Sequence, residues 1–320
     1  GADDKKVNLF TSGKDQDFIL DKYKTSFQEL AKADDLSYSR CAFNDLEVDE
    51  LVKALPVFTA LIDLCLTNNN IGPKGAAALA QVLETSRTLE RLNMDNNYIC
   101  DEGAISMGNL LERSRSIRIL GLPRNGIGVS LGDLKPSFQA ALQDWTAASA
   151  DILQEADFCA ADNQEGAAAL AKGLQMNETL TELYLGDQWN GNPQNRLGDH
   201  GAIILANALV TNNSLTKLDL RFNAVGDQGA CALAKALEVN RSVRELILSN
   251  DNDGFHNDDE FYHKRVRACR NSIGDEGATA FAKSLDANRS ITLIDLSSNM
   301  AIGQRCMSVL ATAVERNRTQ

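Results

Sequence analysis

The chain has 320 residues, of which 43% are hydrophobic and 24% are charged, and its formal net charge is -12. Such an anionic chain lacks the cationic field that binding to nucleic acid or to an anionic membrane requires. The composition therefore argues against nucleic acid and membranes as partners, and it favours a protein partner with a basic surface.

The seven cysteines are scattered along the chain and form no C-x-x-C pair. This spacing predicts neither a disulfide framework nor a structural zinc site, and reduced thiols are typical of the cytoplasm. No apolar run approaches the roughly 20 residues of a membrane span, and the chain does not open with a signal-peptide pattern. We therefore expect a cytoplasmic protein without a bound metal.

Residues 1–35 are predicted to form an N-terminal cap. Within them, the segment 16–33 has the apolar spacing of an amphipathic helix. Its large apolar side chains fall on roughly one helical face: Phe18, Ile19, Tyr23, Phe27 and Leu30. Such a helix would cover the apolar face at the start of the domain that follows.

A 28-residue pattern begins after this cap. From Leu61 it reads L-x-x-L-x-L-x-x-N-x-I-G-x-x-G-A-x-x-L-A-x-x-L, and copies begin again at Leu89 and Ile117. Later copies begin at Leu180, Leu215, Val243 and Ile291, and a degenerate first copy is expected to begin at Leu36. Chance would not keep leucine, asparagine and glycine in phase over so many copies, so residues 36–320 are predicted to form one domain of about eight repeats.

Each copy has the pattern of a strand followed by a helix. In L-x-L the leucines share one face of a short strand, and in A-x-x-L-A-x-x-L the apolar residues recur at helical spacing. The asparagine stands where the chain leaves the strand, and its amide can bond backbone groups there. Because helices are wider than strands, stacked copies must curve. The pattern predicts an α/β fold, a right-handed horseshoe solenoid with a parallel sheet on the concave side and helices on the convex side.

Two copies carry a particularly regular motif. Residues 223–237 read NAVGDQGACALAKAL and residues 271–285 read NSIGDEGATAFAKSL. They resemble the ribonuclease-inhibitor-like leucine-rich repeats, which also occur in the sensor regions of NOD-like receptors and, more loosely, in Ran GTPase-activating protein and tropomodulin. The resemblance implies a leucine-rich-repeat horseshoe. It does not imply one partner, because the family binds many unrelated proteins.

Three stretches exceed the 28-residue spacing, near residues 129–163, 188–194 and 251–270. Each falls between the end of a strand and the start of a helix, so we expect all three to leave the solenoid along one edge. They hold both tryptophans and other large aromatic residues: Trp145, Trp189, Phe255, Phe261 and Tyr262. These rings either pack against the repeats or anchor a partner, and we include them among the predicted partner-binding residues.

The x positions of the strand motif are predicted to face the hollow of the horseshoe. In the middle copies, several of these positions hold arginine and aromatic residues, which are enriched at the centres of interfaces. The predicted partner-binding residues of this face are Arg118, Arg124, Tyr184, Arg221 and Phe222. The alternative is an ordinary solvated sheet face.

No catalytic pattern accompanies the repeats. The chain has three histidines and no phosphate loop, nucleophile elbow or H-E-x-x-H motif, so we expect neither an enzyme nor a cofactor. A calcium loop in 251–270 is disfavoured because Phe255 replaces an oxygen ligand. The N-x-[ST] signals fall at the turn after each helix and are interpreted as structural: Asn177, Asn212, Asn240, Asn288 and Asn317.

The sequence therefore predicts a non-enzymatic protein-interaction module, which is a scaffold, an inhibitor or a sensor region. It would bind a partner through the concave face and the insertions. One alternative is a GTPase-activating protein resembling the Ran activator, although the early copies lack a matching catalytic-loop motif. Another is a cytoskeletal, actin-binding protein resembling tropomodulin, whose repeats are more degenerate. The sequence indicates neither the partner's identity nor the oligomeric state.

Overall fold

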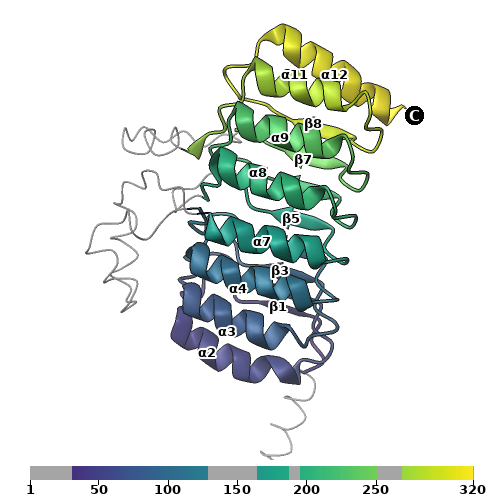
Figure 1. Cartoon of the computed structure of the whole chain (residues 1–320). Helices are drawn as coiled ribbons and strands as arrows, with labels where there is room; N and C mark the ends of the chain where they lie inside the picture. The colour runs from purple at the N-terminus through teal and green to yellow at the C-terminus, as the bar shows by residue number, and fades with distance from the viewer. Residues whose placement is uncertain (1–30, 129–163, 187–194, 251–268, 320) are drawn as a thin grey trace, which may run out of the picture.

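A computed structural model of the chain describes residues 31–128, 164–186, 195–250 and 269–319. In these residues, one parallel sheet contains eight strands in sequential order (Figure 1). The strands are β1 (Asp35–Ser37), β2 (Asp63–Cys65), β3 (Arg91–Asn93), β4 (Ile119–Gly121), β5 (Glu182–Tyr184), β6 (Lys217–Asp219), β7 (Glu245–Ile247) and β8 (Leu293–Asp295).

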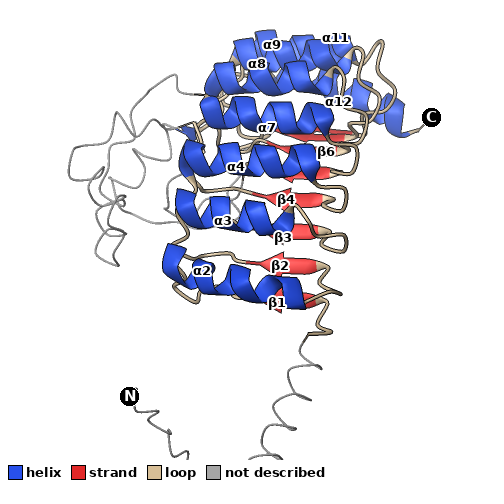
Figure 2. Ribbon diagram, turned by 60° about the horizontal axis from the view of Figure 1, so that its bottom comes forward, coloured by secondary structure: helices blue, strands red, loops and turns tan. Residues whose placement is uncertain are grey.

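A helix follows every strand. The helices are α2 (Asp45–Ala54), α3 (Pro73–Leu83), α4 (Cys100–Arg113), α7 (Glu165–Met176), α8 (Gly198–Leu209), α9 (Asp227–Leu237), α11 (Asp275–Ser284) and α12 (Gln304–Arg318), and a 3-10 turn, η1 (Leu55–Val57), extends α2. All the helices lie on one side of the sheet (Figure 2). Among the helices of the described residues, none combines the length and the hydrophobicity of a membrane span.

The central leucine of each strand forms a continuous core across the repeats. Leu64, Leu92, Leu120, Leu183, Leu218 and Leu246 lie opposite one another in register from strand to strand. Strands pair about 4.8 Å apart whereas packed helices need about 8–10 Å, so the sheet takes the inner side of the curve. The prediction of an α/β solenoid with about eight repeats is confirmed. The open side of the sheet is called the sheet face below.

The first repeat begins three residues earlier than predicted. Leu36 pairs with Leu64, which is the second leucine of the L-x-x-L-x-L motif, so Leu36 is not the first residue of its repeat. Ala33 and Tyr38 take the two other leucine places, and both pack against the core. The prediction that this repeat starts at Leu36 was wrong because neither of these residues is a leucine.

A row of buried asparagines closes the strand end of the second to eighth repeats, and Cys41 takes this place in the first. Asn195, for example, donates to the carbonyls of Leu122 and Leu185 at 2.8 Å and accepts from the N–H groups of Asn125 and Ile127 at 3.0 Å. The same place is taken by Asn69, Asn97, Asn125, Asn223, Asn271 and Asn299. Each amide therefore joins its own repeat to the neighbouring ones.

The three predicted insertions start and end at one edge of the sheet. Residues 129–163, 187–194 and 251–268 lie outside the described residues, as do Trp145, Trp189, Phe255, Phe261 and Tyr262 and nearly all of the predicted cap 1–35. Each gap follows the carboxyl end of a strand, and all strands are parallel. The chain therefore leaves and re-enters the solenoid along a common edge, which is called the strand-end edge below.

A second row of asparagines lies at the opposite edge, at the turns after α7, α8, α9, α11 and α12. Asn240, for example, donates to the carbonyls of Leu209 and Asn212 at 2.8 Å. The equivalents Asn177, Asn212, Asn288 and Asn317 bond in the same way, and all five are at most 6% exposed. The structural interpretation of the five N-x-[ST] signals is confirmed, because these amides are buried and hydrogen-bonded.

Aspartates in the first turns of α2, α4, α8, α9 and α11 bond the start of the next repeat's helix. Asp227 Oδ1 accepts from the N–H groups of Gly274 and Gly277 at 2.8 Å, so it caps the start of α11 from the preceding repeat. Asp101 takes the same place and accepts from Gly128 N–H at 2.9 Å, but it is 3% exposed. Among the described residues, no donor faces Asp101 Oδ2. Burial raises the pKa of this carboxyl to about 6.

Neutralising Asp101 is expected to change how stability depends on pH. The pKa of Asp101 is higher in the folded state than in the unfolded chain, so between pH 4 and 6 the folded state binds more protons at this carboxyl. The contribution of Asp101 to the free energy of unfolding therefore falls as the pH rises through that window. The free energy of unfolding of Asp101→Asn minus that of the parent should therefore rise from pH 4 to 7 in urea titrations. Glu178→Gln, which removes an exposed carboxyl that does not contribute to the shift at Asp101, is the control. A difference that stays flat for Asp101→Asn would contradict this account.

Candidate functional site

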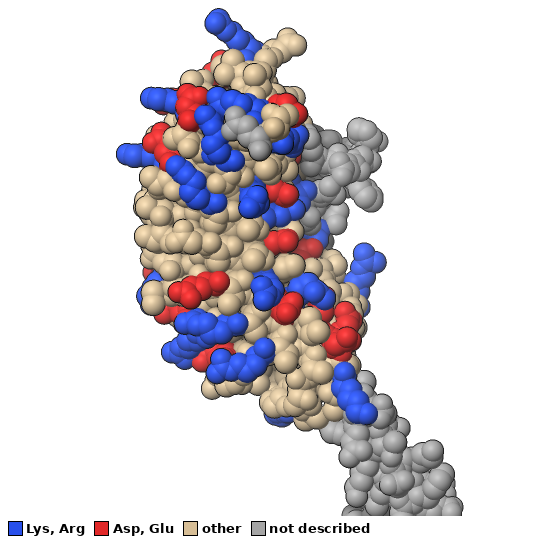
Figure 3. Space-filling view, turned by 90° about the vertical axis from the view of Figure 1, so that its right-hand side faces the viewer, with Lys and Arg blue, Asp and Glu red and all other residues tan. Residues whose placement is uncertain are grey.

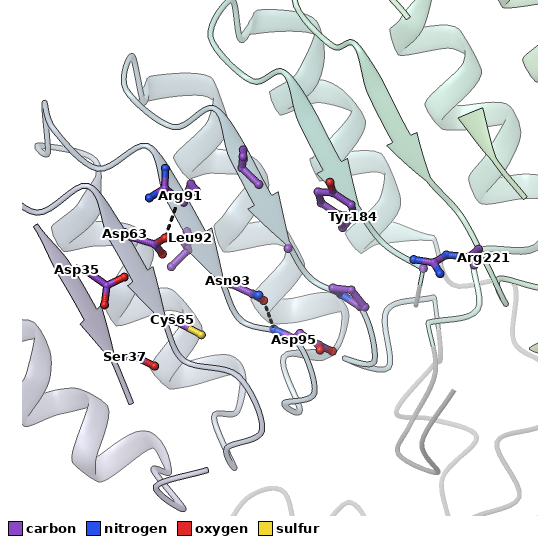
Figure 4. Close-up of a pocket in the computed structure, with 14 residues that line it drawn as sticks. Asp35, Ser37, Asp63, Cys65, Arg91, Leu92, Asn93, Asp95, Tyr184 and Arg221 are labelled. Atoms are coloured by element: carbon purple, nitrogen blue, oxygen red, sulfur yellow. Dashed lines mark hydrogen bonds and ion pairs between the residues drawn. The ribbon is translucent and has the colours of Figure 1, made fainter. Parts of the chain in front are cut away.

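A hollow of about 450 Å³ lies on the sheet face, over the strands from β1 to β5 (Figure 4). Its lining includes Ile119, Gly121 and Pro123 from the fourth repeat. Gly121 supplies no side chain at the middle of the sheet, and a Cβ there would lie 2.9 Å from Asn93 Oδ1. Absence of this one side chain keeps the hollow open.

Tyr184 on β5 stands beside this floor and is held by charged neighbours. Its hydroxyl donates to Glu182 Oε2 at 2.5 Å, and Lys217 Nζ lies 5.4 Å from the ring centroid while pairing with Glu245 at 3.2 Å. Burial, together with the hydrogen bond to Glu182, raises the pKa of the Tyr184 phenol. The ring is therefore a neutral, oriented wall of the hollow.

Alternating charges surround the floor. Arg91 Nε donates to Asp63 Oδ2 at 2.6 Å. Asp35 on β1 lies next to Asp63, so the side of the hollow formed by β1 and β2 is acidic (Figure 4). On the other side, Arg221 forms an ion pair with the buried Asp219 at 2.6 Å. Paired charges hold these side chains in fixed positions, which lowers the entropy lost when a partner binds.

The five sheet-face residues predicted from the sequence do not form one group. Tyr184 and Arg221 both line the hollow. Arg118 is exposed at the start of its strand, 3.7 Å from Glu90, and is not part of the lining. Arg124 and Phe222 are only 4% and 1% exposed.

The expected placement of Arg124 and Phe222 in the hollow was wrong. At this eighth place of the repeat the backbone has a left-handed φ, 53° at Arg124 and 52° at Phe222, so the strand's alternation has already ended. Arg124 instead donates to both carboxylate oxygens of Asp95, at 2.9 and 2.5 Å. Neither side chain is presented to a partner, and both leave the candidate site.

Sequence reasoning missed the residues at the third place of the motif. Asp35, Asp63, Arg91 and Ile119 are two positions before the fifth place and share its face of the strand. The period-two rule could have found them. Opposite charges 28 residues apart, as in Asp63 and Arg91, were the signal for a cross-strand pair.

A family model described as "Leucine Rich repeat" matches residues 61–80, 85–108 and 211–234. These segments coincide with repeats that the sheet and its asparagine row define. The chain contains leucine-rich repeats. No catalytic family is indicated, and the described residues hold no group of three or more His, Cys, Asp or Glu side chains that could bind a metal ion.

Two solved structures are similar to part of the leucine-rich-repeat chain. One is described as "Leiomodin-1 Actin-Binding Site 2 (ABS2)", with 20% identity over 48% of this chain and 72% of that one and a TM-score of 0.36. The other is the tropomodulin C-terminal domain of Caenorhabditis elegans, with 17% identity over 61% of this chain and 93% of that one and a TM-score of 0.38. A comparison with curated protein sequences gave no significant match.

Proposed function

We propose that this chain is a non-enzymatic protein-interaction module that holds a partner protein against its sheet face. The observation that carries the proposal is the hollow over Ile119 and Gly121, bounded by Tyr184. Its volume of about 450 Å³ lies within the usual range of binding cavities, about 300–1,000 Å³. An apolar floor with an oriented tyrosine and fixed charges at the rim is typical of the anchor position of a protein interface.

The partner would insert one large apolar or aromatic side chain into this hollow. The charged rim would then contact polar groups around that anchor, and the acidic side at Asp35 and Asp63 would favour a basic surface. The aromatic residues of the insertions, Trp145, Trp189, Phe255, Phe261 and Tyr262, are proposed as further contacts. We also propose a cytoplasmic location and membership of the ribonuclease-inhibitor-like subtype, which the regular repeats 223–237 and 271–285 support.

Filling the hollow is expected to abolish partner capture. Gly121→Leu places a side chain over the floor, and the nearest obstacle is the amide of Asn93, which can move. Captured proteins, quantified by mass spectrometry on immobilised full-length chain, should fall by at least about tenfold for Gly121→Leu. Ala168→Leu introduces the same side chain at an exposed position of α7 and should leave capture unchanged.

One outcome of the capture experiment contradicts the proposal. An identical set of proteins captured by Gly121→Leu, at parental thermal stability, would remove the sheet face as the binding site. Two other assays test the alternatives: stimulated GTP hydrolysis in a single-turnover assay would favour the GTPase-activating one, and cosedimentation with actin filaments would favour the cytoskeletal one.

A further inference from the structure

A second hollow lies between α11 and α12. These two helices lie side by side at the C-terminal end of the solenoid (Figure 1). The hollow is a groove of about 720 Å³. Three cationic side chains line it, namely Lys283, Arg305 and Arg316, against one acid, Asp286. Val309, which is 55% exposed, lies among them. The groove is therefore cationic with an apolar centre, although the chain as a whole is anionic.

The positive charge of this groove is not neutralised by its surroundings. Among the described residues, Lys283 and Arg305 have no ion-pair partner. Arg316 lies 3.4 Å from Asp286, whose side chain is 74% exposed. Water screens the attraction between these two charges, so the ion pair is weak. The Arg316 Nε atom is buried and has no hydrogen-bond partner.

Arg305 stands where the physics of the helix disfavours a cation. The first turn of a helix is the positive end of its dipole, and acids are favoured there. At the equivalent position α4 and α11 hold Glu102 and Glu276, whereas α3 holds Lys74. The first turn of α12 holds Arg305 and no acid. Arg305 therefore adds a cation to the groove at a place where the helix dipole gives it no stabilisation.

More cations lie at this end of the solenoid. Arg289 is exposed in the turn after α11, and Arg318 is exposed at the end of α12, 3.8 Å from Glu315. Figure 3 shows Lys and Arg side chains at this end of the edge opposite the strand-end edge, with Asp and Glu side chains between them. The excess of positive charge in the groove itself attracts an anionic partner even on a chain of opposite net charge.

We propose that the groove between α11 and α12 binds an acidic peptide segment of a partner protein. Arg305 and Arg316 lie eleven positions apart on α12, which corresponds to about 16 Å along the helix axis. An extended segment of about five residues covers that length. Carboxylates near its two ends would pair with the two arginines, and an apolar residue between them would contact Val309. This site is separate from the sheet-face hollow.

The test uses the full chain and a fluorescein-labelled eight-residue peptide with two glutamates at each end and a central leucine. Its fluorescence anisotropy should show saturable binding, and raising the salt from about 50 to about 300 mM should weaken it. The double variant Lys283→Glu/Arg305→Glu should weaken binding by at least about tenfold. The matched control Lys74→Glu/Lys235→Glu makes the same charge change at the equivalent positions of α3 and α9 and should bind like the parent.

Several outcomes would overturn the proposal. These are no binding by the parent chain, equal binding of the peptide in which glutamine replaces glutamate, or equal loss in both double variants. Binding to phosphatidylserine-containing vesicles but not to the peptide would assign the groove to a membrane instead. A glutamate at position 305 suits the start of α12, so the double variant is expected to stay folded. A thermal melt measures whether lost binding comes from unfolding. Gly121→Leu should bind the peptide like the parent, which separates this proposal from the sheet-face function.

Discussion

Replacing Asn271 with alanine is expected to lower the free energy of unfolding by about 3–5 kcal/mol, because each buried backbone group left without a partner costs about 1–3 kcal/mol. The Asn271 amide donates to the carbonyls of Leu220 and Leu248, both at 2.9 Å. Its oxygen accepts from the N–H groups of Asn223 and Val225 at 3.1 and 2.9 Å. An alanine would leave three of these groups unpaired in a site that is 3% exposed, because the Leu248 carbonyl also accepts from Asn299 Nδ2 at 3.0 Å.

Urea denaturation followed by circular dichroism measures this loss. Asn213→Ala is the matched control, because Asn213 is exposed and its amide donates only to the nearby carbonyl of Thr211. We expect that variant to change stability by less than about 0.5 kcal/mol. If Asn271→Ala were as stable as Asn213→Ala, the asparagine row would not hold adjacent repeats together.

The same residue shows why the repeat core could be predicted from the sequence. Asn271 and Asn195 each follow a stretch that exceeds the 28-residue spacing, yet both occupy the asparagine place of the repeat pattern. Leucines at fixed places bury one face and amides at fixed places satisfy the turn, so each repeat carries its own structural instructions. The strand, the helix and the points of interruption therefore followed from residue types alone.

The first repeat shows the limit of that reasoning. Its strand holds Leu36 at one leucine place, but Ala33 and Tyr38 take the two others. A single leucine can be assigned to the first or the second leucine place of L-x-x-L-x-L, and these two places are three residues apart. The predicted start of the repeat was therefore three residues too late. Parallel pairing with β2 selects the correct phase, and pairing is a tertiary property that a single degenerate copy does not encode.

The candidate site was only partly predictable for a related reason. Tyr184 and Arg221 belong to the hollow, but Phe222, one residue further along, is buried because the chain has turned. Strand periodicity applies only over the three residues of each strand and fails beyond them. The hollow itself depends on an absent side chain at Gly121. Since glycine occurs in every repeat from the second onward for packing reasons, nothing in its residue type singles this one out.

Glycine also governs the contact between α4 and α7, and replacing Gly108 there is expected to be severely destabilising. A Cβ at Gly108 would lie 2.4 Å from the carbonyl oxygen of Ala169, and one at Gly173 would lie 2.4 Å from the carbonyl oxygen of Gly108. Both obstacles are backbone atoms, which cannot rotate away. The two helices therefore approach more closely than side chains would allow.

We expect Gly108→Leu to lower the free energy of unfolding by at least about 3 kcal/mol, because overpacking a close helix contact forces backbone shifts. Asn109→Leu introduces the same side chain one residue later, at an exposed position of α4, and should change stability by less than about 0.5 kcal/mol. Thermal and urea unfolding compare the two. A mild effect of Gly108→Leu would mean that α7 can move away from α4 without disturbing the sheet. Because β4 and β5 pair directly beneath these helices, such a movement would have to break that pairing, and the loss should appear as one cooperative transition.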